Sequence, residues 1–409
     1  MNIGKLSIKN IFHKPLYSLL SLISLAISIG LLIGIRQMDT SIRRHFENST
    51  GKIDMIIGAK GSPLQLVLSS ALHIDNPTGN IPYRQAKKIA KNPLIKSAVP
   101  ISYGDNYKGY RIVGTTQGFA PLYNAELQKG RSVQKPMEVV LGHSVAEKLK
   151  LSIGDTFLSS HGLVEEGAHQ HSEPLTVVGI YKPAYKVIDR LIITALESIW
   201  EVHHHGHHDN EHDKHEEHEE EGHEEDGHKE ITSMLVSFRS PSAFLTLPRQ
   251  INENTNMQAV LPKYEMERLF QYTGVGVQAI TWLAYTVLVI SCITIFISLF
   301  KMVKERAFDL ALLRTYGASN LQLVKIVAYE GFLIGLIAWM VGVLLSQMGM
   351  YYIFEILQEN FKQIDIQKFP WQEALQIGVL VLFMIMLSIT MAIPPILKMN
   401  ISNILSNEK

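Results

Sequence analysis

The sequence predicts a membrane protein with four transmembrane α-helices and a large α+β extracytoplasmic domain inserted between helices 1 and 2. Three observations lead to this fold class. Four apolar runs are long enough to cross a membrane, strand and helix patterns alternate between the first two runs, and basic residues gather at the helix ends of one side. The apolar runs cover residues 16–35, 279–300, 326–350 and 374–394.

The first apolar run is predicted to be an uncleaved anchor and not a secretory signal peptide. A signal peptide has about 7–15 apolar residues and a small-residue cleavage site, and no such site precedes Arg36. Residues 1–14 alternate apolar and basic side chains, which predicts a cytoplasmic amphipathic helix on the membrane surface. The alternative is a simple extension of the first helix. We place the transmembrane helices at residues 15–36, 276–300, 325–350 and 374–395.

The basic residues near the helix ends predict the topology. Three lysines precede the first helix, and the connection at residues 301–324 is rich in Lys and Arg, whereas the loop at residues 351–373 is mainly acidic. Because cytoplasmic loops carry the excess of Lys and Arg, we place the N-terminus, residues 301–324 and the tail at 396–409 in the cytoplasm. Arg36, Arg43 and Arg44 follow the first helix on the side predicted to be extracytoplasmic, so they disagree with this topology. We give them less weight, because translocation of a long domain is largely insensitive to such charges.

Residues 37–275 have the pattern of a domain that alternates strands and helices. Strand-like segments end at Gly or Pro, and another strand is expected to begin at Thr156 after the Gly154-Asp155 turn. The predicted strands are 53–57, 110–113, 138–141, 175–180 and 234–238, and the predicted helices are 84–91, 144–150 and 241–252. Such a mixture predicts an α+β domain large enough to bury its own core.

The charge of the chain is the sum of two opposed parts. The whole sequence has 38 basic and 38 acidic residues, but residues 201–230 hold 13 acidic residues and two lysines. Ten of the 17 histidines lie in the same stretch: His203, His204, His205, His207, His208, His212, His215, His218, His223 and His228. Residues 202–229 contain almost no apolar side chain, so we expect a disordered loop.

The histidine-rich loop is a candidate metal site. Neutral imidazoles bind zinc, copper and nickel, and nearby carboxylates favour a cation. We therefore predict that the loop holds Zn²⁺ or a similar divalent metal. The alternatives are a solvated insertion without a role and a pH-responsive charged tract. A second group, His161, His169 and His171 with neighbouring glutamates, is either an addition to this site or an exposed hairpin tip.

No catalytic motif is present in the sequence. It has no phosphate-binding G-x-x-x-x-G-K-[ST] loop, no G-x-S-x-G and no H-E-x-x-H, so we predict no enzymatic activity of its own. The single cysteine, Cys292, excludes an intrachain disulfide and any site with several thiolates. Glu330 is an ionisable residue inside the third apolar run and thus a functional candidate by default. It lies near the cytoplasmic end, which favours snorkelling or a helix contact.

Several motifs together resemble the FtsX-like and MacB-like ABC transporter permeases, the mechanotransmission or type VII group. Gly130-Arg131, the segment at 138–142, the segment at 145–155 and the segment at 175–180 are similar to the MacB periplasmic core pattern. Residues 305–319, ERAFDLALLRTYGAS, resemble the family's E-R-x-x-E-I-x-L-L-R-A-x-G-A-S, with Asp309 where Glu is usual. The resemblance extends to Ile393-Pro394 and residues 400–405. Both histidine-rich insertions lie outside the family pattern.

The resemblance implies a bacterial inner-membrane permease subunit that works with a separate ABC ATPase. Its ATPase-coupling residues would be Arg306, Phe308, Asp309, Leu312, Leu313, Arg314 and Gly317. The expected function is to couple ATP hydrolysis to movement of the extracytoplasmic domain, for export or extraction of a substrate. The alternatives are a metal-linked transport or sensing system and a non-transporting regulator of an extracytoplasmic partner protein. The expected partners are the ATPase, a second copy of the chain and membrane lipids, and nucleic acid is not among them.

Overall fold

The computed structural model describes residues 15–159, 173–205, 229–305, 307–360 and 369–397. The chain divides into two compact units, which we call the helical unit and the α/β unit. The helical unit comprises Met1–Ile42, Tyr272–Asn360 and Ile366–Lys409, and the α/β unit comprises Arg43–Gln271 and Phe361–Asp365. The predicted amphipathic helix at residues 1–14, the tail from residue 398 and histidines 161, 169 and 171 lie outside the described residues.

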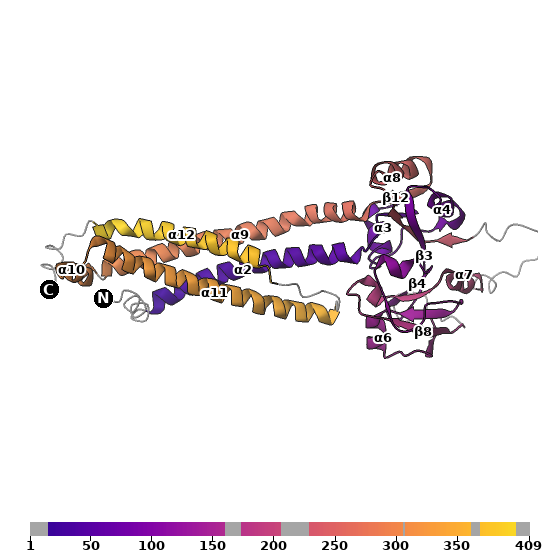
Figure 1. Ribbon diagram of the computed structural model, residues 1–409, viewed down its shortest axis with the longest axis horizontal. Helices are drawn as coiled ribbons and strands as arrows, with labels where there is room; N and C mark the ends of the chain where they lie inside the picture. Colours follow the sequence, from indigo (N-terminus) through magenta and orange to yellow (C-terminus); the bar gives the residue numbers. More distant parts are fainter. Residues whose placement is uncertain (1–14, 160–172, 206–228, 306, 361–368, 398–409) are drawn as a thin grey trace, which may run out of the picture. The chain divides into compact units, whose positions relative to one another are not determined.

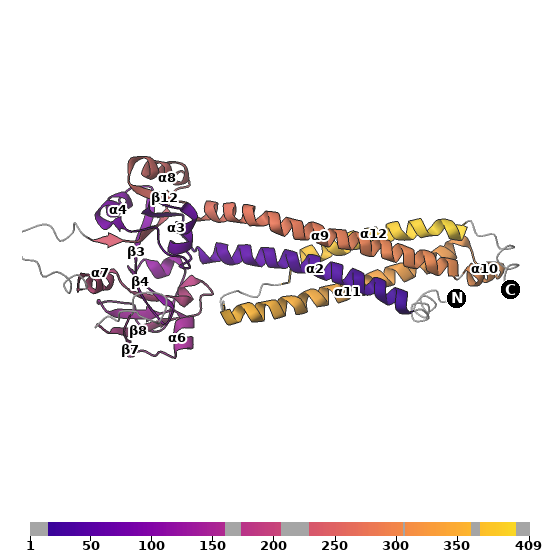
Figure 2. The ribbon, with the colours of Figure 1, turned by 180° about the vertical axis from the view of Figure 1, so that it is seen from behind.

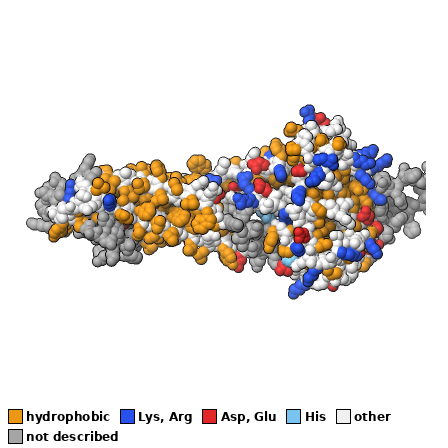
Figure 3. Space-filling model, viewed as in Figure 1, with side chains coloured by type: hydrophobic (Ala, Val, Ile, Leu, Met, Phe, Trp, Pro, Cys, Tyr) orange, Lys and Arg blue, Asp and Glu red, His pale blue; other side chains and the backbone are white. Residues whose placement is uncertain are grey.

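The helical unit contains four helices that are long and apolar enough to cross a membrane (Figure 1). They are α2 (Pro15–Ser49), α9 (Pro262–Glu305), α11 (Asn320–Asn360) and α12 (Trp371–Leu397), and the short α10 (Ala307–Thr315) lies between α9 and α11. Each of the four includes one of the predicted apolar runs. Large apolar side chains cover the outside of these helices (Figure 3), as lipid-facing surfaces require.

Three of these helices extend far beyond the apolar runs that they contain. Beyond its apolar run, α2 continues through Arg36 to Ser49, and α9 begins at Pro262, well before its run. The expected loop after residue 350 is also partly helical, because α11 continues through Tyr351 to Asn360. Hydropathy marks only the part of a helix that lipid surrounds, so polar extensions of the same helix escape it.

Small residues and hydroxyl groups join the four helices. The α2–α9 contact contains a buried hydroxyl cluster, in which the Ser291 hydroxyl lies 2.8 Å from that of Ser24 and 3.0 Å from that of Ser28. Between α2 and α11, Gly30 and Gly342 bring the two backbones together. Contacts of α12 with α9 and α11 complete the packing around a shared apolar core. Small residues at these crossings are typical of membrane helices.

The α/β unit is built on a mixed sheet. The strands are β1 (Met55–Ala59), β2 (Ile81–Pro82), β3 (Ile95–Tyr107), β4 (Tyr110–Thr115), β5 (Leu127–Gly130), β6 (Glu138–Leu141), β7 (Thr156–Phe157), β8 (Leu175–Tyr181), β9 (Ile192–Ala195), β10 (Glu230–Ile231), β11 (Ser233–Phe238) and β12 (Met257–Val260). In the described residues the main sheet has the order β12-β1-β11-β3-β4-β9-β6-β8-β5, with β7 beside β8. The β4–β9 and β6–β8 pairs are parallel and the others are antiparallel. A separate pair joins β10 to β2.

Helices cover both faces of this sheet (Figures 1 and 2). They are α3 (Pro63–Ser70), α4 (Tyr83–Ala90), α5 (Phe119–Leu122), α6 (His143–Leu149), the 3₁₀ turn η1 (Val187–Arg190), α7 (Leu196–His205) and α8 (Ala243–Asn254). Alternate residues of one strand enter different cores: Ile56 packs with α3, whereas Met55 and Ile57 pack on the side of α4 and α8. This explains the continuous apolar strands of the sequence. The predicted fold class is confirmed.

Candidate functional site

The segment between α9 and α11 forms a short helix that is closed by a specific turn. After Thr315 the chain reverses at Gly317, which has φ +90°. The Ala318 N–H donates to the Leu313 carbonyl at 3.0 Å, and the Gly317 N–H donates to the Arg314 carbonyl at 3.1 Å. These two bonds form a Schellman motif, which requires a left-handed residue where glycine has no steric penalty. Gly317 therefore ends α10.

A capping box starts α11 directly after that turn. The Ser319 hydroxyl accepts the backbone N–H of Gln322 at 3.3 Å, and the Gln322 side chain accepts the backbone N–H of Ser319 at 2.9 Å. This reciprocal pair satisfies two donors that a helix start otherwise leaves unpaired. Together, the turn and the box hold α10 at a defined angle to α11.

The side chains of α10 divide between the bundle and the outside. Ala311 is fully buried, and Leu313 packs against the core of the helical unit. Phe308, Leu312 and Arg314 are half-buried, so each presents part of its surface outward. Arg306 and the side chain of Asp309 lie outside the described part of the chain.

Two exposed side chains beside this segment were missed by the sequence reasoning. Tyr316 is 82% exposed at the end of α10, and Leu321 is exposed in the first turn of α11. The sequence did contain a signal for them, because both are large apolar residues beside the helix ends of the predicted coupling segment. α10, Tyr316 and Leu321 together form an amphipathic surface suited to contact with another protein.

Glu330 is buried within the helical unit. Its side chain is only 1% exposed, which disfavours the snorkelling alternative and favours a contact within the bundle. The adjacent Gly331 lies against Leu299 of α9 and Ile389 of α12, so three helices meet at this level. An acidic residue in this setting is a candidate for holding helices in register.

The predicted metal site lies almost wholly outside the described residues. His203, His204 and His205 end α7, although we predicted disorder from residue 202, and their side chains are not described. His207, His208, His212, His215, His218, His223 and His228 lie outside the described ranges. In the part of the chain that the structure describes, no group of three His, Cys, Asp or Glu residues is arranged to hold a metal.

Both ends of the histidine-rich loop are attached to one aromatic cluster. On the α7 side, the Trp200 indole donates to the Glu230 carbonyl at 2.7 Å. On the other side, the Lys229 ammonium lies 5.4 Å from the centre of the Trp200 ring, and the Tyr83 N–H donates to the Lys229 carbonyl at 3.0 Å. Trp200 and Lys229, which flank the loop on its two sides, are therefore in contact within the α/β unit.

The extensions of α2 and α9 are fastened to each other within the α/β unit. Arg43 of α2 makes an ion pair with Glu267 of α9 at 3.7 Å, and its guanidinium lies 4.9 Å from the centre of the Phe270 ring. Phe46 and Phe270 pack edge to face with ring centres 5.7 Å apart. We call these four residues the stalk clamp. Arg43, one of the residues that disagreed with the predicted topology, thus has a structural partner.

The end of α2 is anchored to the core of the α/β unit through Tyr123. The Lys52 N–H donates to the Leu122 carbonyl at 2.9 Å, next to the fully buried Tyr123. The Tyr123 hydroxyl donates to the Ala71 carbonyl at 3.2 Å and lies 3.4 Å from His73 Nε2. The chain just after α2 is therefore attached to the α/β core beside buried, hydrogen-bonded groups.

His73 is a buried titratable side chain that lies between the hydroxyl groups of Tyr103 and Tyr123. Tyr103 donates its hydroxyl proton to the Ser69 carbonyl, so its oxygen accepts the Nδ1–H of His73 across 2.7 Å. Burial lowers the pKa of His73 to about 3, and the positive charges of Arg111 and Arg190 add to the effect. His73 is therefore neutral in the folded protein at pH 7.

This lowered pKa predicts a loss of stability in mild acid. In the unfolded chain His73 takes up a proton near pH 6.5, whereas in the folded chain it does so near pH 3. The contribution to stability is complete above pH 6.5 and is lost as the pH falls from 6.5 toward 3, by about 1.4 kcal/mol per pH unit. Denaturant unfolding of the full chain at several pH values measures it. His73→Asn, which tolerates the positive φ of 55°, should flatten the slope. An unchanged slope would contradict this assignment.

Comparison with known proteins identifies the family. Residues 18–243 match the family model of the MacB-like periplasmic core domain, and residues 282–401 match that of the FtsX-like permease C-terminal region. The first match alone covers more than half of the chain. The chain belongs to the FtsX-like and MacB-like family of ABC transporter permeases. The resemblance seen in the sequence is thereby confirmed.

Three solved structures illustrate what this permease is similar to. The periplasmic region of MacB from Actinobacillus actinomycetemcomitans is 12% identical with a TM-score of 0.34, and the match covers 54% of the permease and 94% of that chain. The extracellular domain of the noncanonic ABC-type transporter YknZ from Gram-positive bacteria is 13% identical, with a TM-score of 0.32 and coverages of 50% and 98%. A domain of a putative permease protein from Porphyromonas gingivalis is 12% identical, with a TM-score of 0.26 and coverages of 52% and 88%. No curated protein sequence matches significantly.

The family and the four apolar helices establish a multi-pass membrane protein with an extracytoplasmic domain. Permeases of this family are typically not enzymes themselves. The α/β unit is the extracytoplasmic domain, because the periplasmic core match covers most of its residues.

Proposed function

We propose that this permease couples ATP hydrolysis by a separate ABC ATPase to movement of its extracytoplasmic domain, in export or extraction of a substrate. The observation that carries the proposal is the course of α2 and α9. Each is a single helix that includes an apolar span and residues of the α/β unit, where the stalk clamp joins them. An unbroken helix transmits displacement along its axis, because every backbone hydrogen bond resists local extension.

The cytoplasmic end of the mechanism is α10 with Tyr316 and Leu321. On the proposed topology the N-terminus, α10 and the C-terminus face the cytoplasm, where the ATPase would bind α10. Phe308, Leu312 and Tyr316 would supply apolar contact, and Asp309 and Arg314 polar contact. Closure of the ATPase would move α10, and its defined attachment to α11 would pass that movement to the bundle. Two copies of the permease would act together as a homodimer.

Charge reversal within α10 tests the ATPase partnership. The variant Asp309→Arg with Arg314→Asp should lose at least about tenfold in recovery of the ATPase during co-purification, since misplaced charges at a contact cost several kcal/mol. The matched control reverses an exposed pair on α8, Arg249→Glu with Glu253→Arg, and should leave recovery unchanged. Equal recovery with both variants would place the ATPase contact elsewhere.

A second candidate function is metal-linked transport or sensing by the histidine-rich loop. The observation that favours it is the density of ten histidines and 13 acidic residues within residues 201–230, flanked by Trp200 and Lys229, which contact each other. Zn²⁺ is the proposed ligand, with copper and nickel as competitors. A non-transporting regulator of an extracytoplasmic partner is the remaining alternative, and it would use the same α2 and α9 without a substrate.

Calorimetry with Zn²⁺ tests the metal proposal. The full chain should bind zinc with a dissociation constant of about 1 μM or lower, as expected for three or four imidazole ligands on a flexible chain. A chain lacking residues 206–228 should lose this binding. The matched control replaces the half-buried histidine of α6, His143→Ala, and should bind zinc normally. Binding that survives the deletion would assign the metal to other residues.

A further inference from the structure

One segment of α9 has a sequence that does not favour a straight helix. The two glycines of this helix, Gly274 and Gly276, lie within residues 273–277, which read Thr-Gly-Val-Gly-Val. Glycine is among the weakest helix formers, and the β-branched Thr and Val lose side-chain freedom in a helix. The segment is helical in the structure although all five of its residues are weak helix formers.

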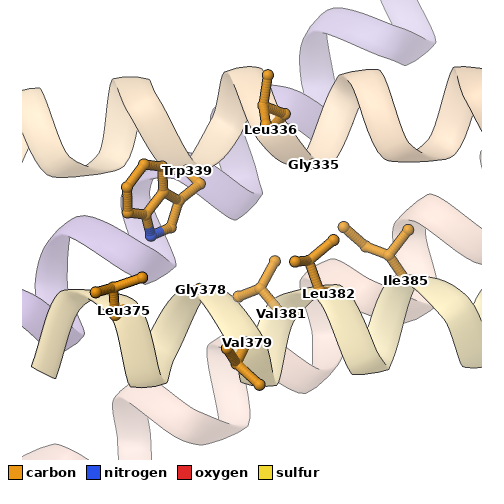
Figure 4. A pocket seen from close by; sticks show the side chains of 9 residues that line it. All are labelled: Gly335, Leu336, Trp339, Leu375, Gly378, Val379, Val381, Leu382 and Ile385. Atoms are coloured by element: carbon orange, nitrogen blue, oxygen red, sulfur yellow. The ribbon is translucent and has the colours of Figure 1, made fainter. Parts of the chain in front are cut away.

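Packing explains other glycines of the membrane helices but not this pair. At Gly378, for example, a Cβ would lie 2.8 Å from Trp339 Nε1, in the groove between α11 and α12 that Figure 4 shows. By contrast, a Cβ at Gly274 or at Gly276 would meet no atom of the described residues within 4 Å. No close approach of another described element therefore requires glycine at these two positions.

The side chains around the pair do not fix the helix either. None of the residues 271–280 is buried, whereas Met266 before this stretch and Ala284 after it are buried and anchor α9. The boundary between the two compact units falls in the same stretch, between Gln271 and Tyr272. Residues 273–277 are therefore constrained neither by their own helix preference nor by burial.

The helix α2, which packs against α9, lacks such a segment. It has no glycine after Gly34, and Gln37 and Ser41 are buried on its extension beyond the apolar run. The stalk clamp joins the two helices at residues of α9 that precede the glycines, and the apolar run of α9 follows them. The weak segment thus separates the clamp from the apolar run on α9 alone.

Sharp bends in helices occur at a few kinds of interruption, glycine among them. We propose that residues 273–277 are a hinge, at which α9 bends between the stalk clamp and its apolar run while α2 stays straight. The clamp then remains closed when the apolar part of α9 changes its tilt. This inference deepens the proposed function, on which the use of the hinge rests, whereas the bend itself is a property of α9.

Paired spin labels on one helix measure the bend. Tyr264→Cys and Leu283→Cys label two exposed positions of α9, which lie about 28 Å apart along a straight helix. Ile27→Cys and Glu47→Cys label α2 at about 30 Å. The full chain, in a Cys292→Ser background, is diluted with unlabelled chain in nanodiscs, so that only distances within one copy contribute. We expect a broad distribution with a shorter component for α9 and one narrow distance for α2.

Replacing both glycines should straighten α9. Gly274→Ala with Gly276→Ala adds methyl groups that meet no described atom, and each change favours the helix about fourfold to fivefold. The shorter component should therefore fall at least about tenfold. Gly349→Ala, a matched change on α11 that also meets no described atom, should leave the α9 distribution unchanged.

This measurement needs no ATPase, so failure of the hinge is distinguishable from failure of the proposed coupling. A single narrow distance for α9 in the parent protein would overturn the hinge. A shorter component that survives in the double alanine variant would overturn it as well. If the parent distance is narrow and the alanine variant no longer forms a dimer, the glycines serve close contact with a second copy.

Discussion

Gly342→Leu is expected to lower the free energy of unfolding of the helical unit by about 1–3 kcal/mol, the usual cost of overpacking. A Cβ at position 342 would lie 2.8 Å from the Ile29 Cβ and 2.9 Å from the Ala26 carbonyl oxygen. Both atoms are part of the α2 backbone or rigidly attached to it, so α2 and α11 must move apart. Gly30 faces the same crossing, where its own Cβ would lie 3.1 Å from the Gly342 carbonyl.

Gly349→Leu is the matched control for this variant. Gly349 lies on the same helix, and a Cβ there would meet nothing within 4 Å. Replacing glycine within a helix favours helix formation by about 0.8–1.0 kcal/mol, so the control should be neutral or stabilising. Thermal unfolding of the purified chain in detergent measures both variants. If both variants unfold at the same temperature, α2 and α11 do not cross at Gly342.

Removing the aromatic pair of the stalk clamp is expected to separate ATP hydrolysis from movement of the extracytoplasmic domain. The double variant Phe46→Ala with Phe270→Ala deletes a ring contact worth about 0.5–1.5 kcal/mol beyond its buried area, enough to shift a two-state equilibrium up to about tenfold. With its partner ATPase, the variant should hydrolyse ATP normally. Its domain should no longer change position, because α2 and α9 are no longer held together where they enter the α/β unit.

Spin labels measure that movement directly. A label at the exposed Lys148→Cys, in a Cys292→Ser background, reports the separation between the two copies of the proposed dimer with and without ATP. The matched control removes a second edge-to-face pair of the α/β unit, Phe238→Ala with Phe244→Ala, whose ring centres are 4.7 Å apart. The control should retain the ATP-dependent change even if it is less stable. Loss of movement in both variants would point to general destabilisation.

Six of the twelve described strands of the α/β unit could be predicted from local pattern, but the longest, β3, could not. The predicted strand at 138–141 is β6, and those at 110–113 and 175–180 differ from β4 and β8 only by their final residues. β3 was missed because Pro100 and Gly104 interrupt its pattern. The Pro100 carbonyl points toward β4 and accepts the Thr115 hydroxyl. Proline is tolerated at this position because the β3–β4 pairing ends at Ile101, so β4 needs no backbone N–H from residue 100. Only the pairing of strands shows that no N–H is needed there.

The candidate site was predictable in its local parts and not in its long-range ones. Gly317 and the Ser319-x-x-Gln322 box mark the end of α10 and the start of α11 from neighbouring residues alone. The stalk clamp joins Arg43 and Phe46 to residues more than 200 positions later, and no local pattern connects them. The same applies to His73, whose pKa depends on Tyr103, Arg111 and Arg190.

The sequence by itself determined the four membrane helices, the α+β class of the inserted domain and the family. These follow from hydropathy, residue periodicity and contiguous motifs, which are properties of short stretches of chain. The tertiary structure decided how far α2 and α9 continue beyond their apolar runs, where Gly30 meets Gly342, and that α11 and α12 leave a groove beside Trp339. Each of these depends on side chains from distant segments meeting in space, because packing and burial are properties of pairs of elements and not of either sequence alone.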